Sequence, residues 1–247
     1  MSSYVLAIRN HPESGPGRYP AWLRAAGLEV EVRPGEDGLP GDLKGINGLI
    51  MLGGGLMPDD DAAAPWLAEE RTLVARALDE HVPILGICLG GQLLAHVGGG
   101  RVRSDHGVIE RGATRIRLTP AAAEDGLLGR LPASFYAIEN HRDAITELPP
   151  GSVHLAYSED CPNQAFRLGD VAWGLQFHPE ASSANVARWD PAKVRADGFD
   201  HDELIRLAQS WNPRVSAPAA RSPRRSPPWC TSTPQPDGSA FGCRIRG

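Results

Sequence analysis

The sequence predicts an α/β fold built on an open, mostly parallel β-sheet. Two short runs, 48–52 and 84–87, are apolar, as expected of strands that are buried on both faces of a parallel sheet. The first run ends in three glycines, and a helical pattern begins directly after the second. Later in the chain, Gly169-Asp170 separates two strand candidates and predicts a hairpin, which adds a small antiparallel extension to the sheet.

The other elements follow from the same patterns in chain order. The first strand is predicted at 4–8, and a helix at 20–26 ends at Gly27. Residues 28–33 alternate between apolar and polar and predict a half-buried strand. Further strands are predicted at 101–103, 114–118, 134–138, 153–157, 164–168 and 171–177, and further helices at 65–81, 89–97 and 200–211. We expect these elements to form one domain over residues 1–212.

The composition excludes several classes of protein. The net charge of −5 and the 41% of hydrophobic residues are ordinary for a globular protein, and no basic face for nucleic acid is evident before residue 213. No apolar run is long enough to span a bilayer and the N-terminus lacks a signal pattern, so we expect a cytoplasmic protein without membrane contact. The four cysteines have neither metal-ligand spacing nor a disulfide pattern; they are residues 88, 161, 230 and 243.

Residues 213–247 differ in composition from the rest of the chain. They contain six arginines against one acidic residue and are rich in proline and serine, which predicts a disordered extension. A shift of the reading frame would change the composition in the same way, and both origins stay open.

The stretch Gly86-Ile87-Cys88-Leu89-Gly90 joins the strand at 84–87 to the helix at 89–97. It matches the Gly-x-nucleophile-x-Gly elbow, in which the central residue sits on a sharp, strained turn and glycines avoid clashes. The turn places the Cys88 thiol over the carboxyl edge of the sheet, where the first amides of the helix favour a thiolate. Cys88 is therefore the candidate nucleophile; the alternative is a buried cysteine beside a loop glycine.

A cysteine nucleophile needs a base and a group that orients the base. The hairpin leads into Gln176-Phe177-His178-Pro179-Glu180, where His178 and Glu180 would point the same way on a regular strand. Taken alone, such a pair is common and indicates a surface ion pair. Joined to a thiol elbow, it supplies the base, His178, and the orienting carboxylate, Glu180. Among the other histidines only His141, in the segment 139–143, has a comparable polar setting.

Three glycines, 53–55, follow the strand at 48–52 and leave backbone N–H groups open to a ligand. Because the strands at 48–52 and 84–87 are predicted to be parallel, their carboxyl ends meet at one edge, where ligands bind in open α/β sheets. The N–H groups of Gly54 and Leu89 are then placed to form an oxyanion hole beside the thiol.

The chain resembles the class I (triad-type) glutamine amidotransferases over about residues 4 to 211. Two long motifs, 83–95 and 173–180, and two shorter ones, 52–55 and 66–70, carry the resemblance. It implies a flavodoxin-like sheet with helices on both faces. It also implies that Cys88, His178 and Glu180 act as nucleophile, base and orienting group.

The resemblance further implies a pocket for glutamine. Gln92, four residues after the nucleophile, corresponds to a glutamine-contacting residue of the family. The segment 140–143 corresponds to the family's His-Gly-Asp or Asn-His-Gly segment, and Arg142 stands where a glycine is usual. The substrate-binding residues implied in this way are Gln92, Asn140, His141, Arg142 and Asp143.

The reaction that the resemblance implies is hydrolysis of L-glutamine to glutamate and ammonia, and it needs no metal or cofactor. In the family, ammonia normally passes to a synthase domain. No such domain is predicted here, because no nucleotide-binding glycine loop and no foldable segment after residue 211 are present. We therefore expect a separate synthase subunit, as in standalone GMP-synthase-like amidotransferases, or release of free ammonia.

Two other functions remain open at this point. A γ-glutamyl hydrolase would use the same triad on γ-glutamyl conjugates, and Arg142 would suit a longer acidic substrate. A thiol sensor or chaperone on the same sheet would keep the elbow cysteine, but it would not require His178 and Glu180.

Overall fold

The computed structural model describes residues 4–210; residues 1–3 and 211–247, and with them the tail predicted to be disordered, lie outside this range. The strands are β1 (Tyr4–Arg9), β2 (Glu29–Pro34), β3 (Ile46–Met51), β4 (Ile84–Ile87), β5 (Arg101–Arg103), β6 (Glu110–Leu118), β7 (Ser134–His141), β8 (Ala144–Glu147), β9 (Val153–Tyr157), β10 (Ala165–Leu168) and β11 (Ala172–Leu175). The helices are α1 (Tyr19–Ala25), α2 (Trp66–Asp79), α3 (Leu89–Val97), α4 (Ser183–Val186), α5 (Pro191–Ala196) and α6 (His201–Ser210), with 3₁₀ turns at Gly35–Asp37 and Pro120–Glu124. No helix within this range is long and apolar enough to cross a membrane.

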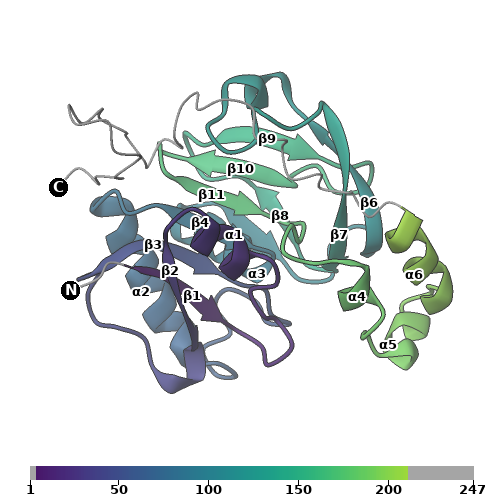
Figure 1. Ribbon diagram of the computed structural model, residues 1–247, viewed down its shortest axis with the longest axis horizontal. Helices are drawn as coiled ribbons and strands as arrows, with labels where there is room; N and C mark the ends of the chain where they lie inside the picture. Colours follow the sequence, from purple (N-terminus) through teal and green to yellow (C-terminus); the bar gives the residue numbers. More distant parts are fainter. Residues whose placement is uncertain (1–3, 211–247) are drawn as a thin grey trace.

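Among the described residues, nine strands form one sheet in the order β2-β1-β3-β4-β11-β10-β9-β6-β7 (Figure 1). Neighbours from β2 to β11 run parallel, and those from β11 to β7 run antiparallel. The predicted α/β fold, with a mostly parallel sheet and an antiparallel extension, is therefore confirmed. A separate two-stranded sheet pairs β5 with β8.

Helices cover both faces of the parallel part of the sheet. Successive residues of β1 point to opposite faces, as the two-residue period of a strand requires. Leu6 and Ile8 join a core that includes side chains of α2 and α3. Val5 and Ala7 face the other side, where they belong to a core that packs against α1. Burial on both faces accounts for the apolar runs that mark these strands in the sequence.

The short helices α4 to α6 lie beside β6 and β7, at the far end of the molecule from β2 (Figure 1). Ile138 of β7 packs there with Val186, Val194, Leu204 and Ala208. The sequence patterns predict α6 but neither α4 nor α5, each of which is too short to show a helical period. Strand β8 is likewise missed, and it belongs to the small sheet rather than to the main one.

Several predicted strands have different bounds in the structure, and three of these differences bear on the site. Strand β6 begins at Glu110 and β7 continues to His141, so both extend beyond the predicted ranges 114–118 and 134–138. Strand β11 ends at Leu175 instead of residue 177. The chain bends there, and His178 forms an isolated bridge with Ile138 of β7.

The glycines around β4 allow α3 to lie directly on the backbone of neighbouring strands. A Cβ atom on Gly90 would lie 2.2 Å from the carbonyl oxygen of Met51 in β3. A Cβ atom on Gly86 would lie 2.3 Å from the carbonyl oxygen of Gly90. Such contacts are far inside van der Waals distance, so a side chain at either position would push α3 away from the sheet.

We predict that Gly90→Ala destabilises the fold. The clash with the Met51 carbonyl should cost about 1–3 kcal/mol or more. Alanine favours a helix over glycine by only about 1 kcal/mol, so we expect a net loss of stability. Equilibrium urea unfolding measures the change. The matched control is Gly41→Ala, because a Cβ atom there meets nothing within 4 Å. Equal unfolding midpoints for Gly90→Ala and the unsubstituted chain would contradict the prediction.

Candidate active site

Cys88 sits at the turn between β4 and α3, as the elbow motif predicts. Its backbone has φ 52° and ψ −111°, a strained conformation for a residue that is not glycine. The Cys88 amide donates to the carbonyl of Leu175 in β11 over 2.8 Å, which ties the turn to the neighbouring strand. The residue is 6% exposed, and α3 begins at Leu89, so the helix N-terminus adjoins the thiol. This position suits a nucleophile at the edge of the sheet.

His178 and Glu180 lie side by side close to this turn. Nδ1 of His178 and Oε1 of Glu180 are 2.7 Å apart. The two residues are not on a regular strand, but the backbone on both sides of the pair is anchored. The His178 amide donates to the carbonyl of Ile138, and the Glu180 carbonyl accepts from the amide of Arg18. The predicted pairing of histidine and carboxylate is therefore present, although the strand that was expected to produce it ends earlier.

The thiol and the imidazole converge on Gly53. A Cβ atom built on Gly53 would lie 3.1 Å from Cε1 of His178 and 3.9 Å from Sγ of Cys88. Nε2 of His178, on the ring edge away from Glu180, is buried and has no hydrogen-bond partner of standard geometry among the described residues. Catalytic hydrogen bonds are often loose in the absence of substrate. The contact with Gly53 is one that the sequence patterns do not single out.

Opposing effects set the charge of His178. Burial alone lowers its pKa, but the Glu180 carboxylate and the Cys88 sulfur raise it, and the resulting pKa is well above that of an ordinary histidine. The raised pKa favours the imidazolium form of the ring. An imidazolium beside a cysteine sulfur is the arrangement found in cysteine nucleophiles.

The predicted oxyanion-hole residues, Gly54 and Leu89, are neighbours in the structure. A Cβ atom on Gly54 would lie 2.9 Å from Cδ2 of Leu89 and 3.2 Å from Cβ of Asn10. The glycine loop and the start of α3 therefore meet, as parallel β3 and β4 require. The donation of these two amides to an oxyanion stays a prediction.

Gln92 joins α3 to the segment at the end of β7. Its side chain is 2% exposed, and Nε2 donates to the carbonyl of Asp143 and to Oε1 of Gln176, each over 3.2 Å. The structure thus brings together two parts of the predicted glutamine pocket, Gln92 and Asp143. Gln176 is a further member that lies within the His178 motif but was not singled out.

The other predicted substrate-binding side chains are engaged with protein groups. Oδ1 of Asn140 accepts from Nη1 of Arg111 over 2.6 Å. The Arg142 guanidinium donates to Asp105 over 3.0 Å and to Asp197 over 2.6 Å, which links the segment to α5. Their contact with substrate stays a prediction. The structure also gives Arg142 a role that the sequence does not indicate, because its side chain joins Asp105 and Asp197, which lie far from it in the chain.

His141 belongs to a second group of polar side chains. Its Nε2 lies 2.9 Å from Oε2 of Glu110, and its Nδ1 lies 3.1 Å from the carbonyl oxygen of Asp143. Both His141 and Glu110 are buried. His141 therefore supports the Asp143 backbone to which Gln92 donates. Its predicted direct contact with glutamine stays a prediction.

The fold and the site together define an α/β protein with a cysteine at a strand-to-helix elbow and a paired histidine and glutamate beside it. The family model described as "Glutamine amidotransferase class-I" matches residues 20–187. The chain belongs to the class-I glutamine amidotransferase family, as its motifs indicate, and is a glutamine amidotransferase by enzyme class.

Relatives and solved structures agree with this assignment. One subunit of the glutamine-hydrolysing GMP synthase from Pyrococcus abyssi is 35% identical over 164 residues, which cover 65% of this chain and 80% of the relative. A GMP synthase from Porphyromonas gingivalis is 39% identical over 159 residues, but the match covers 64% of this chain and only 29% of the relative. A glutamine amidotransferase from Thermotoga maritima superposes with a TM-score of 0.76 at 26% identity, covering 85% of this chain and 91% of that one.

We predict that Glu180→Gln lowers the pKa of His178. The Glu180 carboxylate raises this pKa by stabilising the imidazolium, and an amide in its place removes the negative charge. The His178 ring should then lose its proton at lower pH than in the unsubstituted chain, which NMR titration of labelled histidine measures. Asp79→Asn, at an exposed carboxylate at the end of α2, is the charge-matched control. An unchanged or raised pKa in Glu180→Gln would show that another group holds the proton.

Proposed function

We propose that this chain hydrolyses the side-chain amide of L-glutamine, with Cys88 as nucleophile, His178 as base and Glu180 as orienting group. The observation that carries the proposal is the position of the His178 ring. One edge of the ring meets Glu180 at 2.7 Å, and the ring and the Cys88 side chain both approach Gly53 at the carboxyl edge of the parallel strands. Nucleophile, base and carboxylate in this order form the constellation of a covalent amide hydrolase.

The reaction begins with attack of the Cys88 thiolate on the glutamine carboxamide carbon. The tetrahedral intermediate carries a negative oxygen, which the amides of Gly54 and Leu89 are placed to stabilise; one such donor is worth about 2.7–4 kcal/mol in related chemistry. The His178 imidazolium then gives its proton to the departing nitrogen, so that ammonia leaves and a thioester forms on Cys88.

The second half of the reaction releases glutamate. His178, now neutral, takes a proton from water, and the resulting hydroxide attacks the thioester carbonyl. The carbon–sulfur bond breaks, glutamate leaves and Cys88 returns to the thiolate. Glu180 holds the ring by its Nδ1 atom throughout and stabilises the imidazolium without taking the proton itself.

We further propose that the ammonia passes to a separate synthase subunit. The relative from Pyrococcus abyssi is named as one subunit of a GMP synthase, which points to a second subunit, and the match covers 80% of its length. A GMP-synthase-like partner is therefore the first acceptor to test. The γ-glutamyl hydrolase alternative loses its main support, because Arg142 is paired with Asp105 and Asp197.

We predict that Cys88→Ala abolishes ammonia release from glutamine. Loss of the nucleophile of such a constellation lowers turnover by about 10⁴–10⁶-fold. Glutamate and ammonia formation by the full chain are measured with and without a candidate synthase partner, since a partner can be needed for activity. Cys230→Ala is the matched cysteine control and should keep the activity. Equal turnover of Cys88→Ala and Cys230→Ala would refute the nucleophile assignment.

We predict a preference for free glutamine over γ-glutamyl peptides and amines. Gln92, which is hydrogen-bonded to Asp143 and Gln176, would limit the proposed glutamine site to a small substrate, whereas conjugates need room beyond the scissile amide. Comparison of kcat/KM for glutamine and for a γ-glutamyl amine measures the preference. Faster hydrolysis of the conjugate would support a γ-glutamyl hydrolase, and modification of Cys88 without hydrolysis of any amide would support a thiol sensor.

A further inference from the structure

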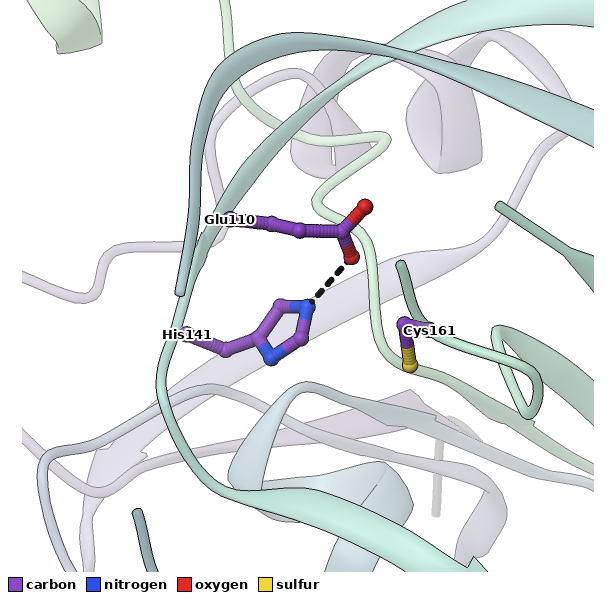
Figure 2. A group of neighbouring side chains, drawn as sticks. All are labelled: Glu110, His141 and Cys161. Atoms are coloured by element: carbon purple, nitrogen blue, oxygen red, sulfur yellow. Dashed lines mark hydrogen bonds and ion pairs between the residues drawn. The ribbon is translucent and has the colours of Figure 1, made fainter. Parts of the chain in front are cut away.

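A second group of chemically active side chains lies beside the proposed active site and takes no part in the triad. It contains Glu110 from β6, His141 from the end of β7, and Cys161 from the turn between β9 and β10 (Figure 2). One ligand atom from each of the three residues lies within 4.8 Å of the other two, and all three residues are buried. A buried thiol, imidazole and carboxylate that converge in this way are the donor types of a transition-metal site.

The hydrogen bonds of His141 leave its Nε2 atom as the converging donor. Nδ1 lies 3.1 Å from the carbonyl oxygen of Asp143, and because a carbonyl can only accept, Nδ1 carries the proton. Nε2 points toward Glu110 at hydrogen-bond distance (Figure 2), and the proton between the two atoms is the one that a metal ion would displace to bind the Nε2 lone pair. Metal-binding histidines usually donate their other ring N–H to a carbonyl or carboxylate in this manner.

Glu110 is held in place from two sides. Ser158 donates its hydroxyl to Oε1 over 2.7 Å, and Gln164 donates its amide to Oε2 over 2.7 Å. Carboxylates that bind metals are themselves hydrogen-bonded in the same way, because an oriented ligand binds more tightly. Ser158 and Gln164 would therefore hold Glu110 in place whether or not a metal ion is bound.

Glu139 lies next to this group of donors. Its side chain is 0% exposed, and neither carboxylate oxygen has a hydrogen-bond partner of standard geometry among the described residues. Oε2 lies 3.5 Å from Nε2 of His141, on the same face of β7. A buried carboxylate without a hydrogen-bond partner thus adjoins the three converging donors, as expected of a group that faces a bound cation.

We propose that Glu110, His141 and Cys161 bind one Zn²⁺ ion, with the Glu139 carboxylate beside it. Zinc prefers thiolate, imidazole and carboxylate donors in a tetrahedron, with bonds of about 2.0–2.3 Å, which places the donors about 3.3–3.8 Å apart. The Nε2 to Oε2 distance of 2.9 Å would widen slightly, and the sulfur would move inward. Calcium and magnesium prefer oxygen donors alone, so the thiol and the imidazole select a softer metal.

The site has a route of entry and a simple proton balance. A cavity of about 130 Å³ is lined by both His141 and Cys161; its other lining residues include His106, Asp160 and Pro162. On binding, the Cys161 thiol and the hydrogen bond between Nε2 of His141 and Oε2 of Glu110 each lose a proton to solvent, because the thiolate and the free ring nitrogen are the ligand forms. Three protein donors leave the fourth position of the tetrahedron to water or to the neighbouring Glu139 carboxylate. The ion would join β6, β7 and the 158–161 turn, and so support the Asp143 carbonyl that holds Gln92.

The test uses the full chain with Cys161 as its only thiol. Cys88→Ala, Cys230→Ser and Cys243→Ser together remove the three other thiols of the sequence, including that of the proposed nucleophile. This protein is loaded with Zn²⁺ or Co²⁺, freed of loose metal by gel filtration, and analysed for bound metal and absorbance. We expect about one metal per chain, a raised melting temperature and, with Co²⁺, a thiolate-to-cobalt charge-transfer band.

Two further variants make the test specific. Adding Cys161→Ser should remove the charge-transfer band, and Ser158→Ala, which keeps all three donors but loses a support of Glu110, should weaken binding by about 10–100-fold. Absence of retained metal, or retention that Cys161→Ser leaves unchanged, would overturn the proposal. The result is independent of the proposed glutaminase activity, because the test protein lacks Cys88 and the readouts involve no turnover.

Discussion

The close contact between α3 and the sheet is the constraint on which the active-site geometry depends. Cβ atoms on Gly86, Gly90 and Gly91 would each meet backbone atoms at 2.7 Å or less, from α3 itself, from β3 and from β11. Because α3 starts directly after β4 and lies this close, the chain has to turn within one residue. Cys88 takes that turn at φ 52°. The strain that presents the thiol therefore results from packing that glycine alone permits.

Strand β11 links this turn to His178, the proposed base. The carbonyl of Leu175 accepts from the Cys88 amide, and three residues later the His178 amide donates to Ile138 of β7. Cys88, the proposed nucleophile, thus belongs to the parallel half of the sheet, and His178, the proposed base, is held by the antiparallel half. The antiparallel extension is therefore more than a peripheral addition, because it determines where the imidazole lies relative to the thiol.

The sequence predicts the site best where each functional residue lies within a motif. Cys88 follows a buried strand between glycines, and His178 and Glu180 follow a hairpin, so local patterns are enough to locate them. Arg142 is different, because its partners Asp105 and Asp197 lie far from it in the chain. The short helices α4 and α5 are also missed, since they depend on packing against β6 and β7 rather than on their own periodicity.

The second polar group is hidden from the sequence for a related reason. Glu110 and His141 face each other at the paired ends of β6 and β7, in segments where buried polar residues replace the apolar ones that mark a strand. Gly112, with φ 85°, interrupts the alternation further. The spacing of 110, 141 and 161 follows no metal-binding motif, so only the pairing of strands brings the three residues together.

The chain therefore uses the pairing of a histidine with a glutamate twice, and the environment decides what each pair does. The imidazole of His178 has a thiol at its other edge, so its proton can move to a substrate. The other nitrogen of His141 is fixed by the Asp143 carbonyl, so its ring can only support the fold or bind a metal.

The two groups are also coupled, because burial and then the Glu110 carboxylate raise the pKa of Glu139 while the nearby His178 lowers it. A charge on Glu139 would favour the His178 imidazolium. Neutralising that carboxylate, by a proton or by a cation, would therefore change the charge that the His178 ring experiences.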